Sequence, residues 1–350
     1  MNDLFLKDAI PVTEQNWDDA TAPLVSVFSW SYNHLDCISP SIDSILIQKT
    51  TFPIEIIIHD DASNDGTIDV IKEYEAKYPK LFRNIIQTEN QWSQGKSVMD
   101  PLMTAPRGKY IALTHGDDYW TDPYKLQKQV DYLNVNEDAV LCFHPVKILM
   151  QDGLLRDDFI TKVPDNYKRI EVISAQGNFL HTPSVVFRNV IRQFPDMIHE
   201  TPIGDYFLQM LLAEHGEFHQ LPDVMAVYRH GVGVWSNQEQ FTRSLRTAKT
   251  HAMLMAYFTQ AKNHVIVEIF ARRIAGFMQR FSAEIENKHI EYLIPNYEIA
   301  VPVMQAMNRD LKKKSDAVER LKSSQLQTSS IKKMVTELSR RIAHKLRGNK

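Results

Sequence analysis

The feature that most constrains the fold is an alternation of short apolar runs with helix-like segments. Residues 24–30 and 54–59 have the length of strands and are rich in apolar, largely β-branched side chains. Residues 38–47, between them, have helical spacing, so this part of the chain predicts a β–α–β unit. Strands that alternate with helices predict an α/β fold with a mainly parallel sheet and helices on both faces. The alternation continues with a helix over 68–78, a strand over 84–87, a helix over 98–105 and a strand over 110–114.

The second half of the chain becomes increasingly helical. Residues 124–133 predict a helix, residues 140–143 and 184–187 predict strands, and residues 204–214 predict another helix. Residues 245–310 are mostly α in pattern. We therefore expect the sheet to be followed by a mostly helical C-terminal region.

Two acidic loops follow strands of the predicted sheet. His59-Asp60-Asp61 ends one strand, and His115-Gly116-Asp117-Asp118 follows another. Because ligands of such sheets bind beyond the carboxyl ends of the strands, both loops are expected in one crevice. Adjacent buried carboxylates are costly unless a cation or a hydrogen-bond donor meets them, and Mg²⁺ or Mn²⁺ prefers carboxylates with phosphate oxygens. The second loop therefore predicts a metal–diphosphate site, and capping of the next helix by Asp117 or Asp118 is an equal alternative.

The loop over residues 60–67 is dense in turn-forming residues. Ser63, Asp65 and the Gly66-Thr67 pair suit Asx turns and a helix cap that need no ligand. This explanation leaves out Asp60 and Asp61, which we expect to accept hydrogen bonds from a base or a ribose.

Together these residues resemble the glycosyltransferase family 2 enzymes of the GT-A fold. The resemblance rests on three segments in a fixed order. They are the strand and Tyr-Asn pair over 25–33, the Asp-Asp-Ala-Ser-Asn-Asp-Gly-Thr loop over 60–67 and Gly-Asp-Asp-Tyr-Trp over 116–120. It covers roughly residues 23–235 and leaves the C-terminal third unexplained. It implies a GT-A type, Rossmann-like sheet and transfer of a sugar from a nucleoside diphosphate donor.

The resemblance also implies roles for individual residues. The nucleotide would be held by Tyr32, Asn33, Asp61, Lys96 and Asp117. A divalent cation, Mn²⁺ or Mg²⁺, would be coordinated by Asp118 with Asp117. Such a cation offsets the negative charge that develops on the departing diphosphate.

A catalytic base is implied at the start of a later helix. Asp205 matches the position of the carboxylate that takes the acceptor's proton in inverting members, although a plain helix N-cap is the alternative. Arg229, His230 and Trp235 are expected to contact the diphosphate or the acceptor. In one departure from the family, His115 stands where the metal motif usually begins with an acidic residue. We group His115 with the acceptor or diphosphate contacts, and it leaves the identity of the cation open.

Other classes of protein fit the sequence less well. A nucleotidyltransferase that makes sugar nucleotides would want a Gly-rich, basic loop after the first strand, but residues 31–35 contain no Gly, Lys or Arg. A dehydrogenase would need a Gly-x-Gly-x-x-Gly segment after a strand. A non-catalytic GT-A-like binding protein is favoured by His115 and disfavoured by the intact carboxylates. No nucleic-acid partner is expected, because the basic residues gather in one terminal segment without aromatic residues among them.

Charge and cysteine content bear on compartment and partners. Residues 311–350 hold 12 Lys or Arg and 3 Asp or Glu in a chain whose formal net charge is -3. The two cysteines, Cys37 and Cys142, favour a reducing compartment, and no signal segment is predicted. We expect a cytoplasmic protein that acts on a glycan or lipid-linked glycan acceptor in cell-surface polysaccharide or lipopolysaccharide synthesis. Its basic tail is expected to be a solvated helix face, a homodimer contact or a peripheral contact with the inner face of the membrane.

These patterns divide the chain into three parts. Residues 1–240 are predicted to be the glycosyltransferase domain, with the nucleotide-sugar half over about 23–120 and the acceptor half over about 121–240. Residues 241–321 are the helical region, and 322–350 are a basic amphipathic tail helix.

Overall fold

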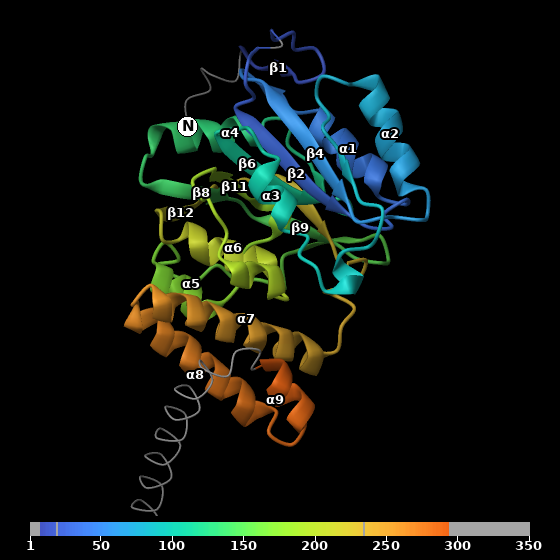
Figure 1. Ribbon diagram of the computed structural model, residues 1–350. Helices are drawn as coiled ribbons and strands as arrows, with labels where there is room; N and C mark the ends of the chain where they lie inside the picture. The colour runs from blue at the N-terminus through green and yellow to red at the C-terminus, as the bar shows by residue number, and fades with distance from the viewer. Residues whose placement is uncertain (1–7, 19, 234, 294–350) are drawn as a thin grey trace, which may run out of the picture. The chain divides into compact units, whose positions relative to one another are not determined.

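A seven-stranded sheet forms the centre of the computed structural model, which describes residues 8–18, 20–233 and 235–293 (Figure 1). Its strand order is β12-β8-β11-β6-β2-β4-β5. Strand β2 pairs in parallel with β4 and β6, and β12 pairs in parallel with β8. Strand β11 is antiparallel to both of its neighbours, β6 and β8. The predicted α/β fold with a mainly parallel sheet is thus confirmed.

The bounds of the strands are as follows: β1 Ile10–Pro11, β2 Val25–Ser31, β3 Lys49–Thr50, β4 Ile54–Asp60, β5 Ile85–Ile86, β6 Tyr110–His115, β7 Tyr119–Trp120, β8 Ala139–Phe143, β9 Val146–Leu149, β10 Leu155–Asp157, β11 Val186–Arg188, β12 Glu217–Gln220 and β13 Ala226–Arg229.

The α-helices are α1 Ile38–Leu46, α2 Thr67–Lys77, α3 Asp100–Thr104, α4 Lys125–Val135, α5 Ile170–Gln176, α6 Gly204–Leu212, α7 Gln240–Gln260, α8 His264–Arg280 and α9 Asn287–Leu293, and the 3₁₀ turns include Trp92–Gln94, Thr182–Ser184 and Asp196–Glu200.

Burial explains why the first strands do not alternate regularly between apolar and polar residues. All seven residues of β4 are buried, and six of the seven in β2. Parallel strands covered by helices on both faces have no solvent-exposed side that would favour a polar residue at every second position. Helix α1 packs with α2 beside this half of the sheet, and α4 packs against β8 and β11.

A second, smaller sheet lies beside the central one and was not predicted. Its order is β10-β9-β13-β7, and β7 directly follows the acidic loop at residues 115–118. Its strands have two to four residues, too few for a period-two pattern to stand out in the sequence. Because β13 pairs with β7, residues 226–227 come to lie against residues 119–120.

The C-terminal region is helical, as expected. Helices α7 and α8 pack against each other, and α6 and α5 lie between them and the central sheet (Figure 1). The chain separates into two compact units, residues 1–293 and 294–350. The predicted heptad pattern at 304–321 and the basic tail at 322–350 lie outside the described residues. The division into domains at residues 240 and 321 therefore stays a prediction.

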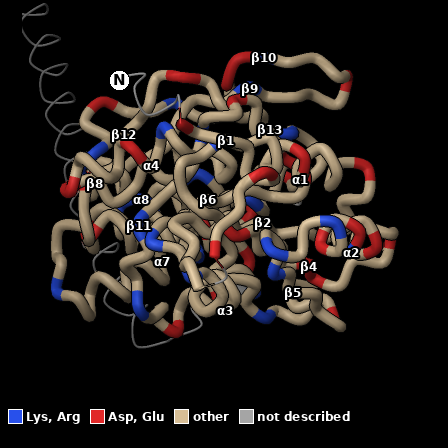
Figure 2. Tube along the Cα trace, turned by 90° about the horizontal axis from the view of Figure 1, so that it is seen from above, with Lys and Arg blue, Asp and Glu red and all other residues tan. Residues whose placement is uncertain are grey.

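Two general observations concern the surface and the helices. Figure 2 shows Lys and Arg interspersed with Asp and Glu over the described residues. Among the described residues, no helix combines the length and the apolar character required to cross a membrane.

Candidate active site

Three strands bring the predicted polar loops to one edge of the central sheet. Trp30, near the end of β2, pairs with His59 of β4 on one side and with His115 of β6 on the other. Neighbouring strands lie about 4.8 Å apart, and only β2 stands between β4 and β6. The loops that follow β4 and β6 are therefore close to each other. The expectation that both acidic loops share one edge is confirmed by this register.

Asp118 is a buried carboxylate with one oxygen that has no hydrogen-bond partner. It is 1% exposed, and its Oδ1 accepts a hydrogen bond from the backbone N–H of Arg229 at 2.9 Å. Its Oδ2 is buried and has no hydrogen-bond partner, and lies 3.9 Å from Nδ1 of His115. Burial and then the neighbouring charge of Asp117 raise the pKa of Asp118 well above its usual value. An uncompensated buried carboxylate of this kind is stabilised by a cation.

The neighbours of Asp118 complete a set of groups that can hold a metal. Ligand atoms of His115, Asp117 and Asp118 all lie within 4.8 Å of one another. A tight turn, in which the N–H of Asp118 donates to the carbonyl of His115 at 3.1 Å, aims these side chains to the same side. Two carboxylates and an imidazole suit a divalent cation such as Mn²⁺ or Mg²⁺, so the residues present fit the expected ion.

Glu55 shows what a buried carboxylate with a purely structural role looks like in this protein. It is 2% exposed, and its oxygens accept hydrogen bonds from Ser26, Arg83 and Arg107. Despite burial, these partners lower the pKa of Glu55 below its usual value. Two arginine side chains donate hydrogen bonds to Glu55, whereas Asp118 accepts only from a backbone N–H and keeps one buried oxygen without a hydrogen-bond partner. This contrast supports a ligand role for Asp118.

Arg229 holds the acidic turn from the second sheet. Besides the backbone bond to Asp118, its Nε donates to the carbonyl of Asp117 at 2.9 Å. The loop after β13 approaches the side chain of Asp117, since a Cβ placed on Gly233 would lie 3.4 Å from its Oδ2. This loop carries His230 and Trp235, and Trp235 is 39% exposed. Arg229, His230 and Trp235 thus belong to the segment that approaches the acidic turn at Arg229 and Gly233, and their roles toward a diphosphate or an acceptor stay predictions.

The loop after β4 is held mostly by its own side chains. As predicted, Asp65 accepts from the backbone N–H and the hydroxyl of Thr67, so this part of the loop needs no ligand. Asp60 is also bonded within the loop, because its oxygens accept from the backbone N–H and the hydroxyl of Ser63, at 2.8 and 2.7 Å. Each of these oxygens keeps a second lone pair, so the expected bond from a base or ribose to Asp60 stays a prediction. Asn33 is part of this network. Its backbone N–H donates to the hydroxyl of Ser63, and its side-chain oxygen accepts from the N–H of Asn64.

Asp61 organises the loop that carries Lys96. Its two oxygens accept from the backbone N–H groups of Gln91 and Trp92, at 2.7 and 3.0 Å. Each carboxylate oxygen has a second lone pair, so Asp61 can still accept a bond from a base or ribose. Lys96 is exposed, and Tyr32, beyond the end of β2, is 41% exposed. Their roles toward a nucleotide stay predictions.

Asp205 stands in the first turn of α6, as the sequence predicts. Its Oδ2 accepts a hydrogen bond from Nδ2 of Asn178 at 2.8 Å, and its Oδ1 accepts from the N–H of Tyr206. Burial raises its pKa above the usual value, while these bonds and the charge of His115 oppose the rise. Asp205 also raises the pKa of Tyr228, after burial, Asp118 and Asp117. These interactions bring Asp205 into the same electrostatic environment as the acidic turn.

The sequence did not single out His34 as a site residue. Its Nδ1 is buried without a partner, and a Cβ placed on Gly116 would meet that atom at 2.6 Å. Burial lowers the pKa of His34, and the charge of Asp117 opposes the shift. Gly116 therefore lets the imidazole lie against the acidic turn. The only sequence signal for His34 is its position directly after the Tyr32-Asn33 pair.

A cavity of about 270 Å³ opens farther along the same edge, where β8 and β12 end. In its wall the Asp158 carboxylate accepts from Nε2 of His181 at 2.9 Å. The ring of His181 lies 4.9 Å from that of Tyr228, which links the cavity wall to the acidic turn. His144 also lines it, with a buried Nε2 that has no partner. The cavity is also lined by the polar residues Thr161 and Gln220 and by the apolar residues Phe143, Val163 and Phe179.

A mainly parallel sheet covered by helices, with an acidic turn at the carboxyl edge of its strands, is an α/β architecture of GT-A type. Residues 26–194 match the model of glycosyl transferase family 2.

Two relatives illustrate the range of sequence similarity. An uncharacterized protein of Mycobacterium tuberculosis is 39% identical over 233 residues, which are 65% of this chain and 65% of that protein. The UDP-Glc:alpha-D-GlcNAc-diphosphoundecaprenol beta-1,3-glucosyltransferase WfaP of Escherichia coli is 32% identical over 115 residues, 33% of this chain and 43% of that protein. The chain thus spans about two thirds or less of the length of these relatives.

Solved structures agree with the fold. S. aureus TarS 1–349 has a TM-score of 0.53 at 14% identity, covering 77% of this chain and 78% of that one. Its complex with UDP has a TM-score of 0.51, also at 14% identity, covering 75% and 76%. At such identity the similarity shows a common fold only.

Proposed function

We propose that the protein is an inverting glycosyltransferase that moves a sugar from a nucleoside diphosphate donor, most simply a UDP-sugar, to a hydroxyl of a glycan. One observation carries the proposal. The buried Asp118 has an oxygen without a partner, beside Asp117 and His115 at the carboxyl edge of the sheet. A divalent cation, bound by this carboxylate and by the oxygens of a diphosphate, would supply the positive charge that the site lacks.

The printed names of similar proteins support the donor and the acceptor class. WfaP is named for UDP-glucose as donor and for a diphosphoundecaprenol-linked sugar as acceptor, and TarS was crystallised with UDP. On this basis we propose a glycan acceptor, free or lipid-linked, and a role in polysaccharide synthesis. Contact of the chain with the inner face of the membrane and formation of a homodimer also stay predictions, since the basic tail lies outside the described residues.

The reaction would proceed by direct displacement. The acceptor hydroxyl oxygen forms a bond to the anomeric carbon, the bond from that carbon to the diphosphate oxygen breaks, and its electron pair leaves with the nucleoside diphosphate. Asp205 takes the proton of the hydroxyl, and attack from the side opposite the leaving group inverts the anomeric centre. A bound cation would stabilise the charge that develops on the leaving diphosphate. His115, Asp117 and Asp118 would hold that cation, and Arg229 keeps their turn in place.

The cavity beside His181 is our candidate for the acceptor's sugar ring. Because Nδ1 of His144 lies 2.8 Å from the carbonyl of Pro145, that nitrogen carries the ring proton. Burial lowers the pKa of His144 well below its usual value, so the ring is neutral and its Nε2 accepts. A sugar hydroxyl is a suitable donor for it.

We expect His144→Phe to raise the KM for the acceptor about tenfold, the loss expected for one hydrogen bond to a buried group, and to leave the KM for the donor unchanged. His219→Phe is the matched control, because the His219 ring stacks on Tyr132 at 3.9 Å and His219 is not among the residues that line the cavity. Steady-state kinetics with each substrate varied in turn provides the measurement. Equal acceptor KM values in the two variants would show that the cavity does not bind the acceptor.

The proposed activity can be tested with a panel of nucleotide sugars and glycan acceptors in the presence of Mn²⁺ or Mg²⁺. We expect release of the nucleoside diphosphate with one donor, dependent on acceptor, and a product of inverted anomeric configuration by NMR. Release of pyrophosphate from a nucleoside triphosphate and a sugar phosphate would instead indicate a nucleotidyltransferase.

A further inference from the structure

The candidate base is held by an amide whose orientation is fixed. Asn178 donates from Nδ2 to Oδ2 of Asp205 at 2.8 Å. Its Oδ1 accepts from the N–H of Leu180 at 3.0 Å and from Nε2 of Gln209 at 3.2 Å. With two donors on the oxygen, the amide can present only its NH₂ group to the carboxylate. This bond stabilises the ionised form of Asp205 and limits the rotation of its side chain.

Asn178 lies in the turn that ends α5, and this turn requires glycine. Gly177 is buried, has φ 90° and donates its N–H to the carbonyl of Ile173. Helix α5 is also bonded to α6 directly, because the hydroxyl of Tyr206 donates to the carbonyl of Ile173 at 3.2 Å. The end of α5 is therefore the support on which Asp205 and its neighbour Tyr206 are both positioned.

The C-terminal helices hold the end of α5. Arg273 of α8 donates from Nη1 to the carbonyl of Ala175, one of the carbonyls that a helix end leaves without a partner. Its Nε donates to Nε2 of His251 in α7 at 3.1 Å. Burial lowers the pKa of His251 well below its usual value, so the ring is neutral and can accept. A Cβ on Gly177 would lie 2.8 Å from Nη2 of Arg273, so the guanidinium fits closely against the turn.

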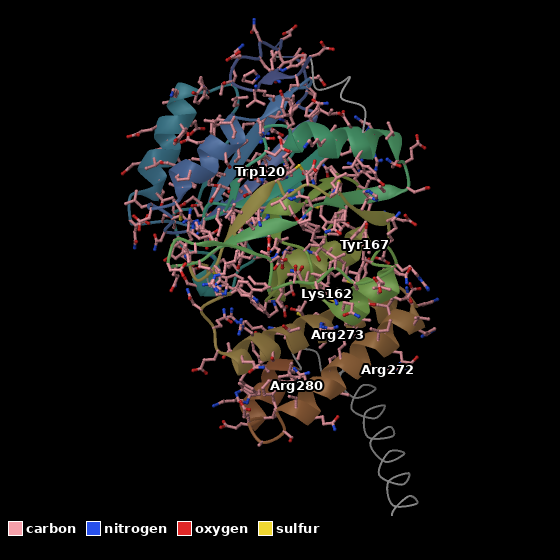
Figure 3. All side chains as sticks on the ribbon, turned by 180° about the vertical axis from the view of Figure 1, so that it is seen from behind. Trp120, Lys162, Tyr167, Arg272, Arg273 and Arg280 are labelled. Carbon is pink, nitrogen blue, oxygen red and sulfur yellow. The ribbon has the colours of Figure 1, made fainter. Side chains whose placement is uncertain are left out.

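Arg273 differs in this respect from the arginine before it. In Figure 3 Arg273 lies toward the body of the molecule, while Arg272 lies on the outer side of α8. The Arg272 side chain is 71% exposed and pairs with Glu268 on its own helix. The two positions therefore provide a test residue and a control on one helix.

We propose that Asn178 is the positioning residue of the catalytic base and that Arg273 and His251 hold its turn, which makes α7 and α8 part of the catalytic unit. The proposal rests on the role of Asp205 in the proposed function. It gives a purpose to helices that lie outside the 26–194 segment matched by the family model.

The test compares full-length variants in the glycosyl-transfer assay. Asn178→Ala removes the donor, and Asn178→Asp places a carboxylate against Asp205. We expect kcat to fall about tenfold to a hundredfold in both, the value of one hydrogen bond to a charged group, while cation-dependent binding of UDP, measured by calorimetry, is unchanged. Arg273→Ala should lower kcat in the same way but less, Arg273→Lys should restore part of it, and Arg272→Ala should equal the parent protein.

The pH profile separates positioning from loss of structure. The charged and titratable groups that interact with Asp205 are His115 from β6 and Tyr228 from β13, and both remain in the Asn178 variants. Without the amide bond, the acidic limb of the kcat profile should move to higher pH. Asp205→Asn is assayed in parallel. Full activity of Asp205→Asn would show that Asp205 is not the catalytic base, which overturns that part of the proposed function. Loss in Asp205→Asn with no loss or pH shift in the Asn178 and Arg273 variants would overturn only the positioning proposal.

Discussion

Asp118→Asn is expected to lower glycosyl transfer at least a thousandfold. Removing this carboxylate removes the group that most needs a cation, and a cation contributes several kcal/mol to departure of a diphosphate. The measurement is kcat/KM for the donor at saturating Mn²⁺ or Mg²⁺.

Stability provides the control for this variant. Without added cation, the Asn side chain relieves the burial of a charge beside Asp117, so Asp118→Asn should unfold at the same temperature as the parent protein or a higher one. In the parent, Mn²⁺ with UDP should raise the unfolding temperature, because ligands that bind only the folded state stabilise it. The variant should show no such rise. A variant that unfolds much earlier than the parent, or that still responds to Mn²⁺ and UDP, would contradict the ligand role of Asp118.

Asp205→Asn is expected to lower kcat by about 10²- to 10⁴-fold, the usual contribution of a general base. Binding of the donor should be unchanged, since Asp205 is not among the groups that fit the cation. An asparagine can still accept from Asn178 but cannot take a proton, so the loss reports proton transfer.

The parent protein should also show a characteristic pH dependence. Burial raises the pKa of Asp205, and the base acts only when it is ionised. As pH falls through this raised pKa, Asp205 becomes protonated and transfer is lost at a higher pH than an ordinary aspartate would give. The acidic limb should be absent from the residual activity of Asp205→Asn. An unchanged acidic limb in that variant would assign the titration to another group.

Much of the donor half of this account could be predicted from the sequence, because its signals are local. Strands β2, β4 and β6 are buried on both faces and are rich in apolar residues, and each acidic loop directly follows one of them. The parallel register then places the loops together without further information. The local pattern did not show that the N–H and the hydroxyl of Ser63 would both donate to Asp60.

The acceptor half of the candidate site depends on long-range contacts, which no local sequence pattern predicts. Strands β7 and β13 have two and four residues, and they pair across more than 100 positions of sequence to bring Arg229 onto the acidic turn. Asn178 meets Asp205 across 27 positions, and Arg273 meets Ala175 across 98. Polar residues in loops and on helices have no periodicity that marks such partners, so the support of the base could be found only in three dimensions.

The central claim is that the carboxylates at the sheet edge bind a nucleoside diphosphate through a divalent cation. Calorimetric titration of UDP and GDP into the full chain, with Mn²⁺ and then with EDTA, tests this most directly. We expect saturable binding of one nucleotide in the presence of Mn²⁺, and its loss in EDTA and in Asp118→Asn. Equal binding with and without the cation, or no binding of either nucleotide, would contradict the claim.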